Sequence, residues 1–377
     1  MSEHFDVCVI GGGMAGLSAA AEIAAARSVV LIEREPHWAY HATGRSAALF
    51  AESYGNAAIR ALTRASRSFY LTGAGPQPFT QPRGALYIAA LEQRADLDAL
   101  FRTLSAVTPR VEMLDPDAAL NLCPALRSDT LSGGLLDPDA RDIDVAAVVD
   151  HYVRQFRSHG GRQCRDSEVV GLEHCAGEWH IQAGNGRMRA TVVVNAAGAW
   201  ADEVARAAGV AIAGLEPRRR TAVRVSAAPW AAAQWPFVAD VSEQWYLRPD
   251  AGALLLSPAD ETPSAPCDAQ PDDYDVALAI ERVEAATRLV VERPLSSWAG
   301  LRTFAPDRTP VVGFDPGSPG FYWLAGQGGY GIQTAPALAR LAAAQITGNA
   351  MPAQLAAEGV DAGALSPARL SPARLIG

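Results

Sequence analysis

The sequence contains no apolar run long enough to cross a membrane. A transmembrane helix needs about 20 consecutive apolar residues, and the apolar stretch near the start, Val7–Ile10, gives way at once to glycines. No basic segment precedes it, so a secretory signal peptide is not indicated. These features predict a cytoplasmic protein without a transmembrane segment.

Lysine is absent, so all 32 basic residues are arginines, and 41 acidic residues give a net charge of −9. Nucleic-acid binding depends on clustered positive charge, so no nucleic-acid partner is expected. The five cysteines are odd in number and form no CxxC pair, so they predict neither a disulfide framework nor a metal site. They are Cys8, Cys123, Cys164, Cys175 and Cys267.

The first 33 residues have the pattern of a β-α-β unit. Phe5–Ile10 reads as a buried strand, Met14–Ala26 as an alanine-rich helix and Val29–Glu33 as a second strand. Between the first strand and the helix lies the glycine turn Gly11–Gly16, which has the GxGxxG spacing of a dinucleotide site.

Each glycine of the GxGxxG spacing has a physical role. Gly11 permits the tight turn, Gly13 lets the backbone approach a pyrophosphate, and Gly16 lets the helix pack on the strand. The pyrophosphate would lie at the helix N-terminus, where free N–H groups favour anions. Glu33 follows about 20 residues later and is placed to accept hydrogen bonds from ribose hydroxyls, which fits NAD and FAD equally.

Two later segments repeat the order of strand, small-residue turn and helix. Thr191–Val194 leads into Asn195–Trp200, which includes Ala197 and Gly198, and Phe321–Ala325 leads into Gly326–Gly331 and a helix over 334–346. A helix N-terminus aimed at the flavin ring stabilises the negative charge of reduced flavin. The second glycine turn therefore favours FAD, and a nicotinamide-dependent dehydrogenase is the alternative.

These segments predict a two-lobed α/β fold in which a Rossmann-type FAD-binding domain is interrupted twice by a β-sheet-rich substrate domain. The expected FAD-binding domain comprises residues 1–81, 142–214 and 298–377. The expected substrate domain comprises residues 82–141 and 215–297.

Two further groups of residues are candidates for binding. The hydroxyls and small side chains of Tyr40–Ala48 could wrap the pyrophosphate and the flavin edge. A planar guanidinium can bind a carboxylate through two parallel hydrogen bonds. Four arginines of the predicted substrate lobe or its border are therefore candidates for an amino-acid carboxylate: Arg218, Arg219, Arg220 and Arg302.

The order of these motifs resembles the D-amino acid oxidase/glycine oxidase (DAO) superfamily, and within it the bacterial D-arginine dehydrogenases. The resemblance is carried by YHATGRSAA, NAAGAW, PRRR, WAGLR and QGGYGIQT together with the first glycine turn. It implies FAD as the cofactor and a hydride transfer from the substrate's α-carbon to flavin N5. Because no cysteine follows Cys267, we expect the FAD to be bound non-covalently. The resulting imine would be hydrolysed, and oxygen or a quinone would reoxidise the flavin.

The resemblance also implies roles for individual residues. Arg220 and Arg302 would hold the substrate carboxylate, Tyr54 and Tyr246 would line the site, and the carbonyl of Gly329 would receive the substrate amine. The implied FAD contacts are Ala15, Glu33, Arg34, Ala42, Thr43, Gly44, Arg45, Ser46, Ala47, Ala48, Val169, Gly328, Gly329, Tyr330, Gly331, Ile332 and Gln333, the last also lining the substrate pocket.

Two positions depart from the D-arginine pattern. Leu49 replaces a histidine, and Ala85 stands where an acid would grip a basic side chain. An unpaired buried charge costs several kcal/mol, so we expect a small or apolar amino acid as the substrate. An N-substituted glycine is the alternative, because the same arginine pair would hold its carboxylate.

Overall fold

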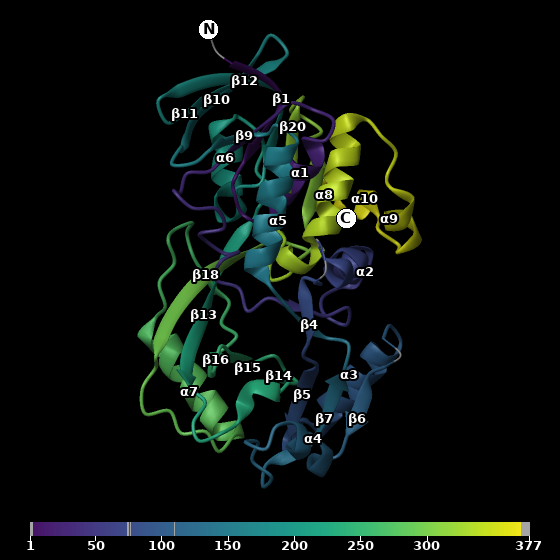
Figure 1. Cartoon of the computed structure of the whole chain (residues 1–377), viewed down its shortest axis with the longest axis vertical. Coiled ribbons are helices and arrows are strands. Elements are labelled where there is room, and N and C mark those ends of the chain that lie inside the picture. The colour runs from purple at the N-terminus through teal and green to yellow at the C-terminus, as the bar shows by residue number, and fades with distance from the viewer. Residues whose placement is uncertain (1–2, 74, 76, 109, 371–377) are drawn as a thin grey trace.

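The computed structural model describes residues 3–73, 75, 77–108 and 110–370. The last seven residues of the predicted FAD-binding domain therefore lie outside the described residues. Figure 1 shows two lobes, each built around its own sheet. The two-lobed α/β fold predicted from the sequence is confirmed by the sheet topology and by the solved structures compared below.

The first sheet has eight strands, and its central strands are parallel. β1 pairs in parallel with β2 and β12, and β20 pairs in parallel with β12. The strands are β1 (Glu3–Ile10), β2 (Val29–Ile32), β9 (Arg162–Cys164), β10 (Val169–Cys175), β11 (Glu178–Ala183), β12 (Gly186–Asn195), β19 (Val311–Phe314) and β20 (Phe321–Ala325).

Alternate residues of the central strands enter two different cores, because successive side chains of a strand point to opposite faces. Val7 and Val9 pack with α1 (Met14–Ile23), α5 (Val145–Ser158) and α8 (Gly331–Thr347). On the other face, Cys8 and Ile10 pack with β10, β11 and α6 (Ala201–Ala207). The remaining helices of this lobe are α2 (Ala57–Thr72), α9 (Ala353–Ala357) and α10 (Ala362–Leu365).

The second sheet has nine strands and contains most of the predicted substrate domain. They are β5 (Ala85–Ala90), β6 (Glu112–Leu114), β7 (Leu131–Asp137), β13 (Glu216–Ser226), β14 (Phe237–Asp240), β15 (Tyr246–Asp250), β16 (Ala253–Ser257), β17 (Thr262–Pro263) and β18 (Ser296–Phe304). The predicted boundary at 297–298 falls inside β18, which pairs with β13 along its whole length. The helices of this lobe are α3 (Arg94–Ser105), α4 (Pro116–Leu122) and α7 (Asp273–Ala286).

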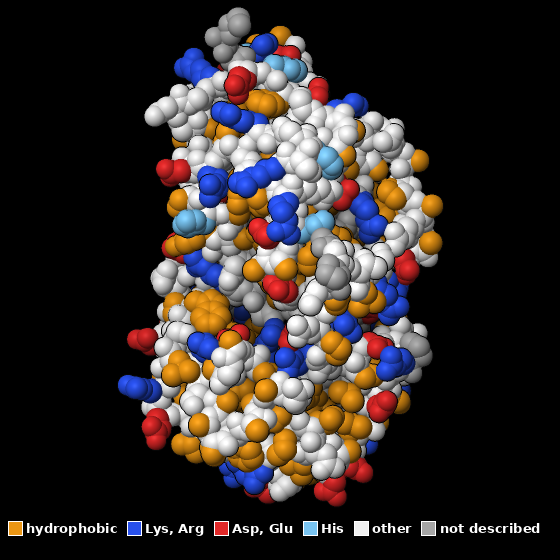
Figure 2. All heavy atoms as spheres, viewed as in Figure 1, with side chains coloured by type: hydrophobic (Ala, Val, Ile, Leu, Met, Phe, Trp, Pro, Cys, Tyr) orange, Lys and Arg blue, Asp and Glu red, His pale blue; other side chains and the backbone are white. Residues whose placement is uncertain are grey.

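A small third sheet is formed by the segments of the chain that connect the two lobes. It comprises β3 (Leu49–Phe50), β4 (Thr80–Pro82) and β8 (Arg141–Ile143), with β8 in the centre. On the face shown in Figure 2, acidic, basic and hydrophobic side chains are interspersed over both lobes. Within the described part of the chain, no helix is long and apolar enough to span a membrane.

The sequence predicted the first β-α-β unit closely. The observed helix ends at Ile23 rather than Ala26, and the second strand ends at Ile32, one residue before Glu33. The C-terminal helix begins earlier than predicted, at Gly331 instead of residue 334. This difference places its first turn directly after the second glycine turn.

Candidate functional site

A single long cavity joins the two glycine turns and reaches the substrate lobe. Its volume of about 380 Å³ is within the usual range for small-molecule sites. Its walls come from the ends of β1, β2 and β12, from the loop after β2, from β13, β15 and β18, and from the turn before α8. The cavity therefore lies along the carboxyl edge of the parallel strands, where ligands bind in open α/β folds.

The first glycine turn has the packing that its spacing predicted. A Cβ on Gly16 would lie 1.8 Å from the carbonyl oxygen of Gly11, so the helix and the turn are in direct backbone contact. A Cβ on Gly13 would meet only the Thr43 hydroxyl, at 3.5 Å. The backbone at Gly13 is thus open toward the cavity.

The N-terminus of α1 faces the cavity without a competing anion. Its N-cap, Gly13, has no side chain, and its first turn contains no acidic residue. The N–H of Met14 donates to the hydroxyl of Thr43 at 3.0 Å. This arrangement suits a pyrophosphate, because unpaired N–H groups and the helix dipole favour negative charge.

Glu33 lies at the far end of the cavity and is only 9% exposed. Its carboxylate accepts hydrogen bonds from the backbone N–H of Gly12, at 2.6 Å, and of Glu35, at 2.9 Å. These bonds hold the carboxylate at the end of β2, in the place expected for an acceptor of ribose hydroxyls.

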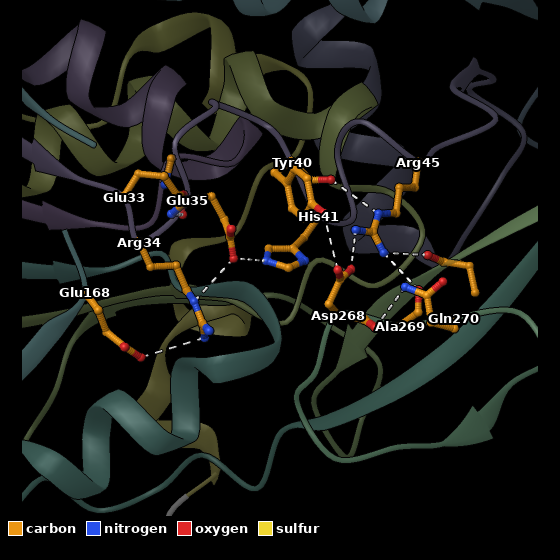
Figure 3. Close-up of polar contacts among 12 residues, drawn as sticks. Glu33, Arg34, Glu35, Tyr40, His41, Arg45, Glu168, Asp268, Ala269 and Gln270 are labelled. Carbon is orange, nitrogen blue, oxygen red and sulfur yellow. Dashed lines mark hydrogen bonds and ion pairs between the residues drawn. The ribbon is translucent and has the colours of Figure 1, made fainter. Parts of the chain in front are cut away.

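Beside Glu33, charged and aromatic side chains cover the cavity (Figure 3). Arg34 forms ion pairs with Glu35 and Glu168 and stacks over the ring of Trp200 at 4.8 Å. Nε2 of His41 lies 2.9 Å from the same Glu35 carboxylate. The shared contacts with the Glu35 carboxylate hold the side chains of Arg34 and His41 in place at the cavity wall.

Arg45 connects the loop after β2 with the substrate lobe. Its guanidinium donates to the carbonyls of Ala269 and Ala299, each at 3.0 Å, and pairs with Asp268 at 2.5 Å. Figure 3 shows Asp268 and Ala269 of the substrate lobe beside this side chain. Arg45 lines the cavity, but its guanidinium binds other residues of this chain rather than facing the cavity.

The substrate end of the cavity contains both predicted arginines on adjacent strands. Arg220 of β13 donates to the carbonyl of Asp260 at 2.7 Å and pairs with Glu261 at 3.3 Å. Arg302 of β18 lies against the second glycine turn, since a Cβ on Gly329 would be 2.9 Å from its Nη1. Among the described residues, the Arg302 side chain has no hydrogen-bond or ion-pair partner.

Both arginines remain charged despite their burial. Burial, and then the neighbouring charge of Arg302, lower the pKa of Arg220. Burial also opposes the charge of Arg302, but Tyr246, Tyr54 and other neighbours outweigh it and the pKa of Arg302 is raised. Guanidinium groups ionise so strongly that both remain cations at physiological pH. The cavity therefore ends in two positive charges suited to a carboxylate.

The N-terminus of α8 supplies the remaining wall. Gly328, Gly329, Gly331 and Ile332 line the cavity, and the first turn of the helix contains no acidic residue. The N–H of Gly328 donates to the carbonyl of Thr303 at 2.8 Å and fixes the turn to β18. A helix start in this position can stabilise negative charge on a bound ring.

Most of the predicted site residues line this one cavity. They are Gly11, Gly13, Ala15, Glu33, Arg34, Ala42, Thr43, Arg45, Ser46, Ala47, Val169, Ala197, Gly198, Arg220, Tyr246, Arg302, Gly328, Gly329, Gly331 and Ile332.

Eight predicted residues lie behind the wall or beside it: Gly16, Gly44, Ala48, Leu49, Tyr54, Ala85, Tyr330 and Gln333. Gln333 donates to Thr63 at 3.0 Å and is 3% exposed, so it joins α8 to α2. Ala85 is fully buried and packs in the core beside Tyr87 and Tyr246. Tyr54 packs its ring on Tyr330 at 4.9 Å.

Sequence reasoning missed a segment that closes one side of the cavity. Cys267 and Ala269 line it, although they belong to the loop between β17 and α7. That loop has no glycine turn or strand pattern, so only its contacts with Arg45 reveal its position. Within the described ranges, no three His, Cys, Asp or Glu side chains are grouped as a metal site would require.

The cavity fits the cofactor that the motifs predicted. An open backbone at Gly13, an acid at the end of β2 and two helix N-termini facing one continuous cavity match the pyrophosphate, ribose and flavin parts of FAD. The residues named above would hold these parts.

Comparison with known proteins finds relatives along most of the chain. The chain is 28% identical over 362 residues to mitochondrial dimethylglycine dehydrogenase of Rattus norvegicus, covering 88% of this chain and 41% of the relative. It thus spans about two fifths of that enzyme's length. It is 24% identical over 351 residues to glycine oxidase of Geobacillus kaustophilus, covering 89% and 91% of the two chains.

The solved structures agree with the fold. The crystal structure of glycine oxidase from Geobacillus kaustophilus superimposes with a TM-score of 0.83 at 21% identity, covering 97% of this chain and 98% of that one. Residues 6–345 match the family described as FAD dependent oxidoreductase, DAO. The chain therefore belongs to the DAO family of FAD-dependent oxidoreductases.

Proposed function

We propose that this enzyme oxidises the bond between the α-carbon and nitrogen of a small or apolar amino acid. The observation that carries the proposal is the cationic end of the cavity, where Arg302 has no partner among the described residues and lies against Gly329. A substrate carboxylate would supply that partner through charge-assisted hydrogen bonds.

The side chains at this end would orient the substrate. Arg220 and Arg302 hold the carboxylate, Tyr246 limits the cavity beside them, and the carbonyl of Gly329 accepts a hydrogen bond from the amine. The bound FAD supplies the acceptor for a hydride from the α-carbon. Orientation and electrostatic complementarity are then the protein's main contribution, and no general base is required when the amine binds in its neutral form.

The surroundings favour a neutral substrate side chain, in contrast with the D-arginine dehydrogenases that the sequence resembles. Ala85 is fully buried, and Leu49 packs in the same core. Glu52, an acid close in sequence to Leu49, pairs with Arg67 at 2.5 Å. That acid is thus paired with Arg67 rather than available to a cation in the cavity.

An N-substituted glycine is the second candidate. The identity of 28% to dimethylglycine dehydrogenase favours it. The same pair of arginines would bind the glycine carboxylate, and the substituent on nitrogen would occupy the space beside Tyr246. Both candidates use the same clamp and differ in whether the apolar group is attached to the α-carbon or to the nitrogen.

An anaerobic screen of flavin reduction tests the proposal. Purified enzyme with absorbance near 450 nm would first exclude a nicotinamide-dependent dehydrogenase. D-amino acids, L-amino acids and N-alkylglycines would then be mixed with it without oxygen. We expect bleaching by a member of one of these sets, whereas a flavin that none of them reduces would refute the proposal. Adding oxygen or a quinone afterwards identifies the electron acceptor.

A further inference from the structure

Glu261 brings a carboxylate to one of the two arginines that are proposed to bind the substrate. It directly precedes β17, in which Thr262 pairs with Arg219 of β13, so the next position along the strand lies beside Arg220. Its Oε1 is 3.3 Å from Nη2 of Arg220. Within the described part of the chain, Arg302 forms no such ion pair. The two arginines are therefore unequal before a substrate enters.

The backbone that carries Glu261 is held by side chains of β13. Nε of Arg220 donates to the carbonyl of Asp260 at 2.7 Å, and Nη1 of Arg218 donates to the carbonyl of Glu261 at 3.2 Å. The carboxylate of Asp260 accepts hydrogen bonds from the N–H and the hydroxyl of Thr221, at 2.7 and 3.0 Å. A change of partner by the Glu261 carboxylate therefore requires only rotation of its side chain.

Arg308 binds the same carboxylate more closely than Arg220 does. Its Nη2 and Nη1 lie 2.8 and 3.0 Å from Oε1 and Oε2 of Glu261, so the pair has two parallel hydrogen bonds. The guanidinium of Arg308 also stacks over the ring of Phe304 at 4.0 Å. Burial opposes the charge of Glu261, but Arg308 and then Arg220 outweigh it, and the pKa of Glu261 is lowered. The carboxylate is thus ionised and shared between two arginines.

The position of Glu261 interferes with a carboxylate on Arg220. A guanidinium binds a carboxylate through two parallel hydrogen bonds on either of two edges, Nε with Nη2 or Nη1 with Nη2. Both edges include Nη2, which faces Oε1 of Glu261. A substrate carboxylate on Arg220 would therefore lie close to the Glu261 carboxylate. Two like charges on one guanidinium repel each other, so Glu261 weakens substrate binding for as long as it stays there.

We propose that Glu261 competes with the substrate carboxylate for Arg220, and that Arg308 retains Glu261 when a substrate displaces it. The inference rests on the proposed function, because it assumes that Arg220 and Arg302 bind that carboxylate. Glu261 is then a positioning residue that acts through Arg220. Together with Arg308 it sets the affinity of the substrate site.

Titration of acetate into the FAD-loaded enzyme tests this competition, since acetate has the carboxylate of both substrate candidates and no amine to oxidise. The flavin spectrum at pH 8 and fixed ionic strength is the readout, and uncharged acetamide is the reference ligand. Glu261→Gln removes the competing charge, so its Kd for acetate should fall at least about threefold, as expected for a partly exposed ion pair. In Arg308→Met, Glu261 loses its closer partner and stays on Arg220, so the Kd should rise.

The double variant Glu261→Gln with Arg308→Met separates competition from a general effect of charge. If the two side chains acted independently on acetate, their opposite effects would add, and the double variant would bind acetate about as the wild type does. Competition requires a different result. Because Arg308 acts only through Glu261, the double variant should bind acetate as tightly as Glu261→Gln alone.

Asp250→Asn is the matched control, because Asp250 pairs with Arg224 of the same strand β13 at 3.0 Å and lies outside the cavity wall. It should bind acetate as the wild type does. An unchanged or raised Kd in Glu261→Gln, or additive effects in the double variant, would overturn the inference while leaving the clamp intact. If acetate perturbed the flavin of no variant, the clamp itself, and with it both proposals, would be refuted.

Discussion

Arg45 and Asp268 form an ion pair of 2.5 Å although they are separated by 223 positions in the sequence. Arg45 belongs to the loop after β2, and Asp268 belongs to the loop that precedes α7. The same guanidinium binds the carbonyls of Ala269 and Ala299, so one side chain ties the cofactor loop to two segments of the substrate lobe.

We predict that Arg45→Met destabilises the protein more than Asp268→Asn does. The first change leaves two carbonyls without a donor, which costs about 1–3 kcal/mol each when they are buried. The second removes an acid that is half exposed, and pairs of that kind contribute less than about 1 kcal/mol. Urea unfolding of both variants would measure the difference. Arg110→Met, which breaks a surface pair with Asp139, is the control.

The same pair predicts a pH dependence. The hydrogen bond from Arg45 is the main cause that lowers the pKa of Asp268 below its ordinary value of 3.8. The stability that the pair contributes is therefore present above about pH 3.8 and is lost as the pH falls through the lower folded-state pKa. The stability difference between wild type and Asp268→Asn should be constant from pH 7 to pH 5 and shrink below pH 4. A difference that grew on acidification would contradict the assignment.

Two glycine substitutions in one turn should separate folding from cofactor binding. Gly16→Ala places a methyl group 1.8 Å from a backbone oxygen, so we expect unstable or insoluble protein. Gly13→Ala meets no atom closer than 3.5 Å, so the apoprotein should keep its melting temperature. Its FAD affinity should fall at least tenfold, because the methyl group occupies the pyrophosphate approach. Equal FAD affinity in Gly13→Ala and wild type would refute this position for the pyrophosphate.

Loss of either clamp arginine should weaken substrate binding and leave FAD in place. Removing one partner of a buried, charge-assisted pair costs about 2–5 kcal/mol. Stopped-flow flavin reduction should therefore show a much higher apparent Kd in Arg220→Ala and Arg302→Ala. Arg224→Ala on the same strand pairs with Asp250 outside the cavity and should bind substrate normally. If both clamp variants kept the wild-type Kd, the clamp would have to be abandoned.

We predict that FAD is bound without a covalent link. No cysteine follows Cys267 in the sequence, and Nε2 of His41 is engaged by Glu35 at 2.9 Å. His41 also packs against Trp200, with ring centroids 4.7 Å apart. Acid precipitation should release the yellow colour into the supernatant. Colour retained in the washed pellet would show a covalent bond, and His41→Ala would then identify its position.

Sequence motifs correctly predicted the parts of the site that directly follow buried strands. The first glycine turn, Glu33 and the second glycine turn all lie directly after buried strands, so strand order alone brings them to one edge. The pair Arg220 and Arg302 was suggested by residue type and resemblance. Its cross-strand proximity depends on the register of β13 with β18, which no local pattern specifies.

The missed residues are positioned by long-range contacts. Cys267 and Ala269 line the cavity because their loop is held by contacts with Arg45. Ala85, which the resemblance places in the substrate pocket, is buried on β5 in the same core as Tyr87 and Tyr246. Such positions follow from strand register and side-chain packing, which a single sequence does not reveal.

The two glycine turns that face the cavity have a consequence for synthesis of the chain. Gly11–Gly16 leaves the ribosome some 300 residues before Gly326–Gly331, and β20 pairs with the middle of the sheet only after that interval. FAD capture therefore waits until almost the entire described chain has emerged. Until then, the edge of β12 at Val193–Asn195 is an unpaired strand edge that other chains can join. Production of soluble enzyme should accordingly depend on chaperones during translation more than on FAD supply.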